Sequence, residues 1–269
     1  MTKTESVAYE QIRNWLSAKC GIHYPSHKQQ VLRQRLSRVQ CAVSQPDLTE
    51  LARRIVGEQE PDLQRAVMHA ASTHHTYFFR ETDVLDQFRA VILETLRERA
   101  EIRIWSAACS TGDEAYTLAI IIAETLGSDA LKRTVILGTD ISAPVVARAE
   151  QGIYPHRHLA HVPSAILNRY FAPVGSDNYQ VNADIRACCT FRQMNLMTTP
   201  YPFQKMFQAV FCRNVLYYFD RPDQVATLDA IHAATEPGGW LVTSVTESVR
   251  DLSDRWRPVE SGISRKGGS

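Results

Sequence analysis

Apolar residues recur at helical spacing through roughly the first 85 residues of the chain, with little of the alternation typical of strands. In the first stretch they are Val7, Ile12, Trp15 and Leu16, and Pro25 then interrupts the pattern. Residues 28–40 carry a second apolar stripe, and two further helical stretches follow at 48–55 and 63–71. The pattern predicts a small all-α domain over residues 1–85.

A different pattern follows, in which short apolar strands alternate with helices. After a helix at 84–99, strands are expected at 102–106, 134–140, 206–212 and 240–244, and helices at 113–126, 143–151 and 223–235. Strands separated by helices of this length imply crossover connections and a parallel sheet. We therefore expect a doubly wound α/β domain over residues 86–255.

Two segments depart from this alternation. Residues 170–194 contain short alternating stretches around the polar turn Gly175-Ser-Asp-Asn178, which predicts a small antiparallel β insert. Residues 256–269 end in a segment rich in Gly and Ser, which we interpret as a flexible tail.

Charge and cysteine content narrow the possible environments and partners. Lys and Arg number 30 against 29 for Asp and Glu, so the chain as a whole carries no basic footprint for nucleic acid. None of the six cysteines forms a C-x-x-C pair, which favours reduced thiols over disulfides or a zinc site. No apolar run approaches the ~20 residues of a membrane span, and the start lacks a signal-peptide core. We expect a cytoplasmic protein without direct membrane insertion.

The loop after the first expected strand, residues 107–112, has small side chains and one glycine, so its backbone can approach a ligand. It lacks the glycine pattern that cradles a pyrophosphate, and Asp113 and Glu114 begin the next helix. Two acids there would repel phosphate but suit the ammonium and ribose of S-adenosylmethionine (SAM). Asp140, at the end of the second strand, can accept both ribose hydroxyl hydrogen bonds. The competing interpretation of Asp140 is a structural group at the start of the helix that follows.

Five motifs, in order, carry a resemblance over the chain up to about residue 250. They are Thr76-Tyr-Phe-Phe-Arg-Glu81, residues 105–116, Gly138-Thr-Asp-Ile-Ser142, Met194-Asn-Leu196 and residues 211–220. Together they resemble the CheR family of chemotaxis protein-glutamate methyltransferases. The resemblance implies a SAM-dependent methyltransferase domain that forms glutamate methyl esters on chemoreceptors for sensory adaptation.

The resemblance also implies roles for particular residues. Thr76 and Arg80 would border the methionine end of SAM, Glu114 and Asp140 would hold the nucleoside, and Arg80 and Tyr218 would lie nearest the methyl group. The remaining cofactor-binding residues implied are His74, Asn195, Leu196, Cys212, Arg213 and Asn214. The sequence departs from the family pattern at His74, where the family usually has Asn, and at Ala115, where it usually has Pro.

A glutamate carboxylate is already ionised at neutral pH, so its methylation needs orientation more than a strong base. We expect Arg80 to hold one acceptor oxygen and Tyr218 to help orient it. The competing interpretations are a surface arginine for Arg80 and core packing for Tyr218. Two other functions stay open: a SAM-binding signalling module without catalysis, and a methyltransferase of another substrate class.

The partner implied by the resemblance is the helical cytoplasmic signalling domain of a methyl-accepting chemoreceptor. Lys28, Arg33, Arg35 and Arg38 could form a basic helix face that docks on its acidic surface, or else a solvated face without a partner. We expect a monomer that does not depend on a receptor's terminal pentapeptide. No metal is expected, because the histidines at 155–161 lack nearby carboxylates or cysteines at ligand spacing.

Overall fold

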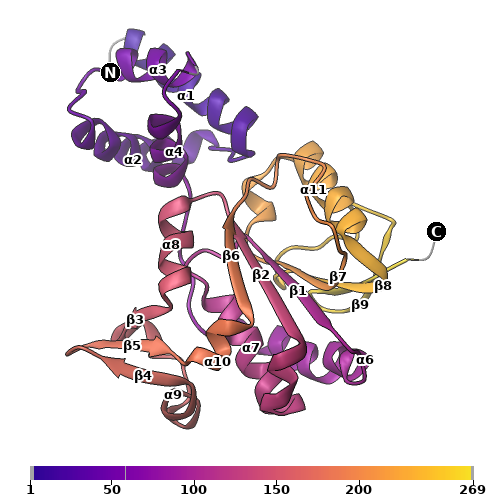
Figure 1. The fold of residues 1–269 in the computed structure, drawn as a ribbon. Coiled ribbons are helices and arrows are strands. Elements are labelled where there is room, and N and C mark those ends of the chain that lie inside the picture. Colours follow the sequence, from indigo (N-terminus) through magenta and orange to yellow (C-terminus); the bar gives the residue numbers. More distant parts are fainter. Residues whose placement is uncertain (1–2, 58, 268–269) are drawn as a thin grey trace.

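The computed structural model describes residues 3–57 and 59–267. The N-terminal part is helical, as predicted, and stands apart from the sheet in Figure 1. Its elements are α1 (Lys3–Cys20), the 3-10 turn η1 (Ser26–Lys28), α2 (Gln29–Ala42), α3 (Leu48–Val56) and α4 (Pro61–Ala71). The four helices share one core, to which Ile12, Leu16, Leu32, Leu51 and Val67 contribute fully buried side chains.

The α/β part contains a seven-stranded sheet in the order β6-β2-β1-β7-β8-β10-β9. Its strands are β1 (Ile102–Ala107), β2 (Thr134–Asp140), β6 (Cys189–Gln193), β7 (Phe207–Cys212), β8 (Thr235–Val242), β9 (Trp256–Glu260) and β10 (Ile263–Lys266). The pairs β1–β2, β1–β7, β2–β6 and β7–β8 are parallel. β2 and β7 lie on opposite sides of β1, so the order of the strands reverses at β1. Folds of this kind bind ligands at such a switch point, at the carboxyl ends of the strands.

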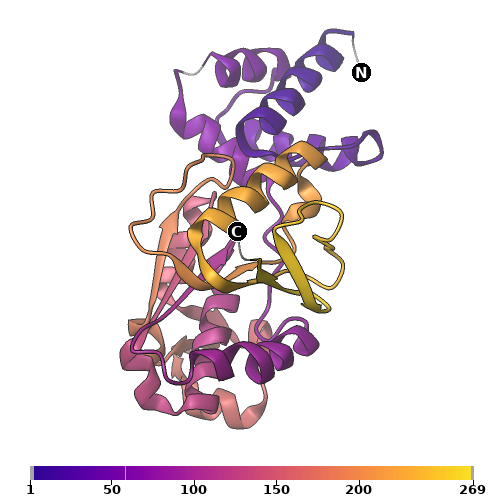
Figure 2. The ribbon, with the colours of Figure 1, turned by 90° about the vertical axis from the view of Figure 1, so that its right-hand side faces the viewer.

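Helices cover both faces of the sheet (Figures 1 and 2). The helices and helical turns of this part of the chain are α5 (Thr82–Gln87), the π-helix η2 (Phe88–Ile92), α6 (Leu93–Leu96), α7 (Asp113–Leu126), η3 (Ser128–Arg133), α8 (Ala143–Gln151), η4 (His156–Leu159), α9 (Ser164–Tyr170), α10 (Ala183–Ala187), η5 (Leu216–Tyr218) and α11 (Arg221–Ala234). Of these, α9 lies below the small second sheet and not against the large one (Figure 1). Successive β1 residues point to opposite faces: Ile104 packs in the core with α7, and Trp105 in the core with α11. The helix predicted at 84–99 forms as α5, η2 and α6.

The predicted small antiparallel insert exists, but its strands differ from those expected. It consists of β3 (Ile153–Pro155), β4 (Phe171–Val174) and β5 (Asn178–Val181), in the order β3-β5-β4. β6, which we assigned to the insert, instead pairs in parallel with β2 at the edge of the main sheet. Only Phe191 of β6 is buried, so this edge strand has the same alternating pattern as an insert strand.

The prediction of a flexible tail from residue 256 is wrong for residues 256–266. These residues form a hairpin, β9 and β10, which continues the sheet antiparallel to β8. Trp256 and Ile263 are buried, and Gly262 takes the positive φ of 73° that the turn between the strands requires. Residues 268–269 lie outside the described residues. Among the helices described, none is long and apolar enough to cross a membrane.

The predicted basic face on α2 is narrower than the sequence indicates. Arg35 donates hydrogen bonds to the Ala71 and Ser72 carbonyls at 2.5 and 2.9 Å and to the Thr73 hydroxyl at 3.0 Å. Its guanidinium therefore joins α2 to the segment that follows α4, because these carbonyls need a donor once α4 ends. Arg33 lies over the Tyr9 ring at 4.8 Å, whereas Lys28 and Arg38 are exposed.

Candidate active site

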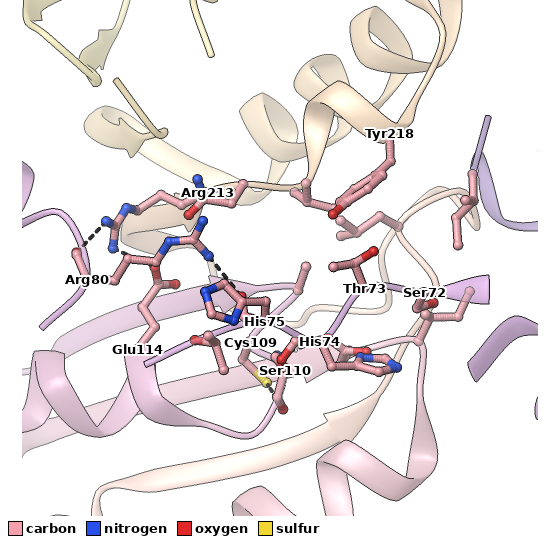
Figure 3. A pocket seen from close by; sticks show the side chains of 18 of the residues that line it. Ser72, Thr73, His74, His75, Arg80, Cys109, Ser110, Glu114, Arg213 and Tyr218 are labelled. Carbon is pink, nitrogen blue, oxygen red and sulfur yellow. Dashed lines mark hydrogen bonds and ion pairs between the residues drawn. The ribbon is translucent and has the colours of Figure 1, made fainter. Parts of the chain in front are cut away.

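A cavity that is partly open to solvent lies at the carboxyl ends of β1, β2 and β7. Its wall is completed by Cys20 and Ile22 of the helical region and by the segment 71–77 (Figure 3). The predicted site residues that line it are His74, Thr76, Arg80, Glu114, Asp140, Asn195, Leu196, Arg213, Asn214 and Tyr218. Cys212 does not line it, because its side chain points into the fully buried core at the end of β7. Its predicted cofactor role is therefore not supported.

The loop after β1 is shaped by residues with left-handed backbone. Ala108 and Ser110 have φ of 61° and 50°, and Gly112 has φ of 87°. Such conformations cost free energy in residues other than glycine and cluster at functional sites. A Cβ on Gly112 would lie 2.8 Å from the Ala149 Cβ, so this glycine serves packing against α8. The part of this loop that lines the cavity is Ala108, Cys109 and Ser110.

Asp140 has both of the roles considered for it: it stabilises the start of the next helix, and it faces the cavity. Its Oδ1 accepts a hydrogen bond from the Ser142 N–H and its Oδ2 from the Ser110 N–H, each at 2.9 Å. The carboxyl group thus fixes the start of α8 and the β1 loop, and it also lines the cavity. Burial raises the pKa of Asp140, while the Ser142 and Ser110 N–H groups act in the opposite direction. Each oxygen retains a lone pair that can accept a ligand hydroxyl.

The two acids at the start of α7 lie in different environments. Glu114 faces the cavity, with its Oε1 accepting from the Ser106 hydroxyl at 2.7 Å and its Oε2 lying 3.0 Å from Arg213 Nη1. Asp113 is fully buried on the other side and binds His158 and Thr111. The expected pair of free acids facing a cation is therefore wrong. Only Glu114 is available to a ligand, and its charge is balanced by Arg213.

Arg213 connects the acids around the site. Its Nη2 donates to the Arg80 carbonyl at 2.6 Å and lies 3.3 Å from Glu81 Oε2. The Arg213 side chain is only 3% exposed, so these interactions are made with little competition from water. Arg213 thereby fixes the backbone that carries Arg80.

Arg80 is not a surface arginine at the end of an aromatic turn. Its Nη1 donates to the His75 carbonyl at 2.9 Å, and its Nε lies 3.9 Å from Glu81 Oε1. Tyr218 is half-buried and lines the cavity from η5, which argues against simple core packing. Figure 3 shows Arg80 and Tyr218 reaching into the same cavity from different segments.

Two further acids, to which the sequence analysis gave no role, support the residues of the cavity wall from behind. Glu247, after β8, accepts from the Asn214 N–H at 2.6 Å and the Tyr217 N–H at 3.4 Å, and so holds the turn that carries Tyr218. Glu81 accepts from Asn214 Nδ2 at 3.0 Å, and Asn214 itself has φ of 58°. Glu81 lies in the first motif, whereas no sequence signal marked Glu247.

The remaining predicted residues form the part of the cavity next to the helical region. Asn195 donates through Nδ2 to the Lys19 carbonyl at 2.6 Å, which ties the loop after β6 to α1. Leu196 is buried beside it. The His74 ring stacks on His69 at 4.7 Å, and its Nε2 lies 3.0 Å from the His69 carbonyl. The ring of His74 is thus held against α4.

One histidine of the 155–161 loop, His158, interacts with Asp113, which lies 45 residues earlier in the sequence. His158 Nε2 lies 2.5 Å from Asp113 Oδ1, and this hydrogen bond raises the pKa of His158 above its ordinary value of 6.5. Because the folded-state pKa is the higher one, the interaction stabilises the fold fully below pH 6.5, and this stabilisation is lost as the pH rises through the raised pKa.

We expect the loss of unfolding free energy caused by His158→Gln to be largest below pH 6.5 and to shrink at higher pH. Urea denaturation of both proteins across the range measures it, with His27→Gln, at an exposed histidine, as the control. A difference that does not change with pH would contradict the assignment.

The donors and acceptors in the cavity fit SAM. Asp140 offers acceptors for ribose hydroxyls, Ile141 and Leu196 provide apolar surface for a base, and Glu114 with Arg213 supplies both charges needed by an amino acid end. These groups converge at the switch point of the sheet, the usual ligand position of this fold.

Comparison with known proteins identifies the family. Residues 74–264 match the model of the CheR methyltransferase, SAM binding domain. The chain is 33% identical to chemotaxis protein methyltransferase Cher2 of Pseudomonas putida over 96% of both chains. It is 36% identical to a chemotaxis protein methyltransferase of Borreliella burgdorferi over 66% of both chains, and 31% identical to one of Vibrio parahaemolyticus over 93% and 92%.

Among solved structures, the glycopeptide N-methyltransferase MtfA with SAM aligns at a TM-score of 0.35 and 16% identity, over 60% of this chain and 52% of that one. That likeness is too distant to carry a conclusion about this chain. The family match and the full-length relatives are sufficient: the chain belongs to the CheR family of SAM-dependent chemotaxis protein methyltransferases.

Proposed function

We propose that this protein-glutamate methyltransferase modifies glutamate side chains on the cytoplasmic helical domain of a chemoreceptor, with Arg80 and Tyr218 as its catalytic residues. The observation that carries the assignment of residues is the convergence of Arg80 and Tyr218 on the cavity that also contains Asp140 and Glu114. A cofactor-binding module without catalysis would not require an arginine and a tyrosine at that place.

The chain's own residues have to align an acceptor that is already nucleophilic. A glutamate side chain, with a pKa of about 4.3, is ionised at neutral pH, so no residue needs to remove a proton. Arg80 holds one carboxylate oxygen by a charge-assisted hydrogen bond and leaves the other free to react. Tyr218 donates its hydroxyl hydrogen bond to the same group. SAM, when bound, supplies a sulfonium methyl group to which the free oxygen bonds as the carbon–sulfur bond breaks.

The remaining residues would hold the cofactor and the geometry. Asp140 accepts from the ribose hydroxyls, Asn195 and Leu196 border the base, and Thr76 borders the methionine end. Glu114, Arg213 and Asn214 form the charged wall beside it. Alignment of this kind contributes most of the rate when the nucleophile is already active.

The substrate assignment is tested with methyl-labelled SAM and a receptor signalling fragment. Label should appear in the fragment and should be absent when its surface glutamates are replaced by alanine. Label that persists in the alanine fragment, or transfer to a small molecule or nucleic acid in its place, would contradict the proposal.

We expect docking on the receptor through the exposed charges Lys28 and Arg38, with Arg33 beside them. Lys28→Glu combined with Arg38→Glu should lower kcat/KM for the receptor about tenfold at low salt, with a smaller effect at high salt, because the attraction is screened. The Kd for SAM should not change. Arg35 is left out of the test because its guanidinium holds the segment after α4.

The matched control carries the same charge change away from α2. Lys132→Glu with Lys205→Glu replaces two lysines whose side chains are 82% and 64% exposed, near the amino ends of β2 and β7. Receptor kinetics equal for the two double variants would refute docking through α2.

The remaining proposals concern the location of the enzyme, its oligomeric state and its binding of receptor peptides. We propose that it works in the cytoplasm, where receptor signalling domains lie, and as a monomer. Independence of a receptor's terminal pentapeptide stays a prediction, which a titration with that peptide would overturn by showing tight binding.

A further inference from the structure

Two tyrosines that contact the catalytic residues, Tyr77 and Tyr217, have no role in the reaction described above. The guanidinium of Arg80 lies over the Tyr77 ring, 5.8 Å from its centroid. Tyr217 comes from η5, and its ring packs against Tyr218 with 4.5 Å between centroids. Tyr218 lines the same cavity as Arg80 and Tyr77, so the Tyr217 ring packs against a residue of that cavity. We call Tyr77 and Tyr217 the aromatic rim.

Tyr217 is unusual because it is both exposed and held in place. Its residue is 49% exposed, among the largest values for a big apolar side chain in the described chain. Its N–H donates to the buried Glu247, and its hydroxyl lies 3.5 Å from that of Tyr218. Val245, on the loop that carries Glu247, is 51% exposed as well. A tyrosine fixed in this way offers contact area at little cost in conformational entropy, as is typical of binding surfaces.

The charge and spacing at this surface favour one kind of occupant. Arg80 can bind a carboxylate, and the aromatic rim can bind apolar side chains. In a helix, residues three or four positions apart lie on the same face, with Cβ atoms about 5–6 Å apart, and the Tyr77 ring lies directly against the Arg80 guanidinium. A helix whose glutamate meets Arg80 therefore brings the side chains one turn away over the rim.

We propose that the aromatic rim, Tyr77 and Tyr217, binds the apolar side chains that lie one helical turn from the glutamate to be methylated, and so selects which glutamates react. The proposal rests on the proposed function, since it needs a helical glutamate acceptor. It extends that function by assigning acceptor selection to two residues to which no role in methyl transfer has been given above.

Tyr217→Ala should raise KM for the receptor fragment about tenfold, the size expected when an aromatic contact is truncated, while kcat changes much less. Tyr217→Phe keeps the ring and should restore KM to within about twofold. Met206→Ala is the matched control, because Met206 is 47% exposed and lies at the opposite end of β7. Calorimetric titration with SAM checks that each variant is folded.

A change on the acceptor side gives a second, independent test. Replacing the apolar residue one turn from the methylated glutamate by serine should raise the KM of the unaltered enzyme. The same replacement should raise the KM of the Tyr217→Ala enzyme little further, because both changes remove the same contact. If ester forms on the fragment but Tyr217→Ala leaves KM unchanged, or the two changes are additive, the rim proposal is wrong. If the unaltered enzyme forms no ester on the fragment, the proposed function fails first.

Discussion

Arg80→Ala should lower kcat for methyl transfer by at least about 10³-fold and leave the Kd for SAM within about tenfold. In the proposed mechanism the side chain holds the acceptor oxygen, and loss of alignment and charge at the reacting group costs several kcal/mol of the barrier. The change removes the hydrogen bond to the His75 carbonyl but keeps the one from Arg213, which binds the backbone carbonyl of Arg80 and not its side chain. Steady-state transfer to a receptor fragment gives kcat, and calorimetry gives the Kd.

Arg80→Lys is the informative companion. Lysine keeps the positive charge but lacks the planar guanidinium, so we expect the activity of Arg80→Lys to lie between those of the unaltered enzyme and Arg80→Ala, closer to that of Arg80→Ala. Full activity of Arg80→Ala would remove Arg80 from the mechanism.

Asp140→Ala should weaken SAM binding by about 10²-fold, because it removes the acceptors for ribose and releases the two N–H groups that shape the loop. Asp140→Asn is the control for size: its amide nitrogen would face the Ser110 or Ser142 N–H, so it should weaken binding as well, though less than alanine. Calorimetric titration with SAM measures both. Once SAM is saturating, kcat should recover to within a few-fold. An unchanged Kd for Asp140→Ala would show that the carboxyl group serves only the fold.

The layout of the fold could be predicted because it rests on strong local patterns. The long apolar run of α7 differs clearly in length from the short buried strands β1 and β7. The errors fell where burial is partial. Edge strand β6 buries only Phe191, so its pattern matched that of an insert, and the terminal hairpin depends on Trp256 packing at long range.

The cavity-facing residues could be predicted largely because they lie in contiguous motifs that resemble a family. Interactions between distant segments could not. His158 pairs with Asp113, and Arg35 with the carbonyls after α4, and nothing in the sequence near either residue indicates its partner. Glu247 was missed for the same reason, since its hydrogen bonds go to the turn after β7. Cys212 was misplaced because its neighbour Arg213 lines the cavity, whereas strand geometry directs Cys212 into the core.

The central claim is that the product is a glutamate methyl ester formed by alignment at Arg80 and Tyr218. The most direct measurement is the release of volatile methanol by mild alkali from a receptor fragment methylated with labelled SAM. We predict that nearly all label is released as methanol from the unaltered enzyme's product, and that Arg80→Ala yields none above background. Label that resists alkali, as an N-methyl group or an ether would, would contradict the account.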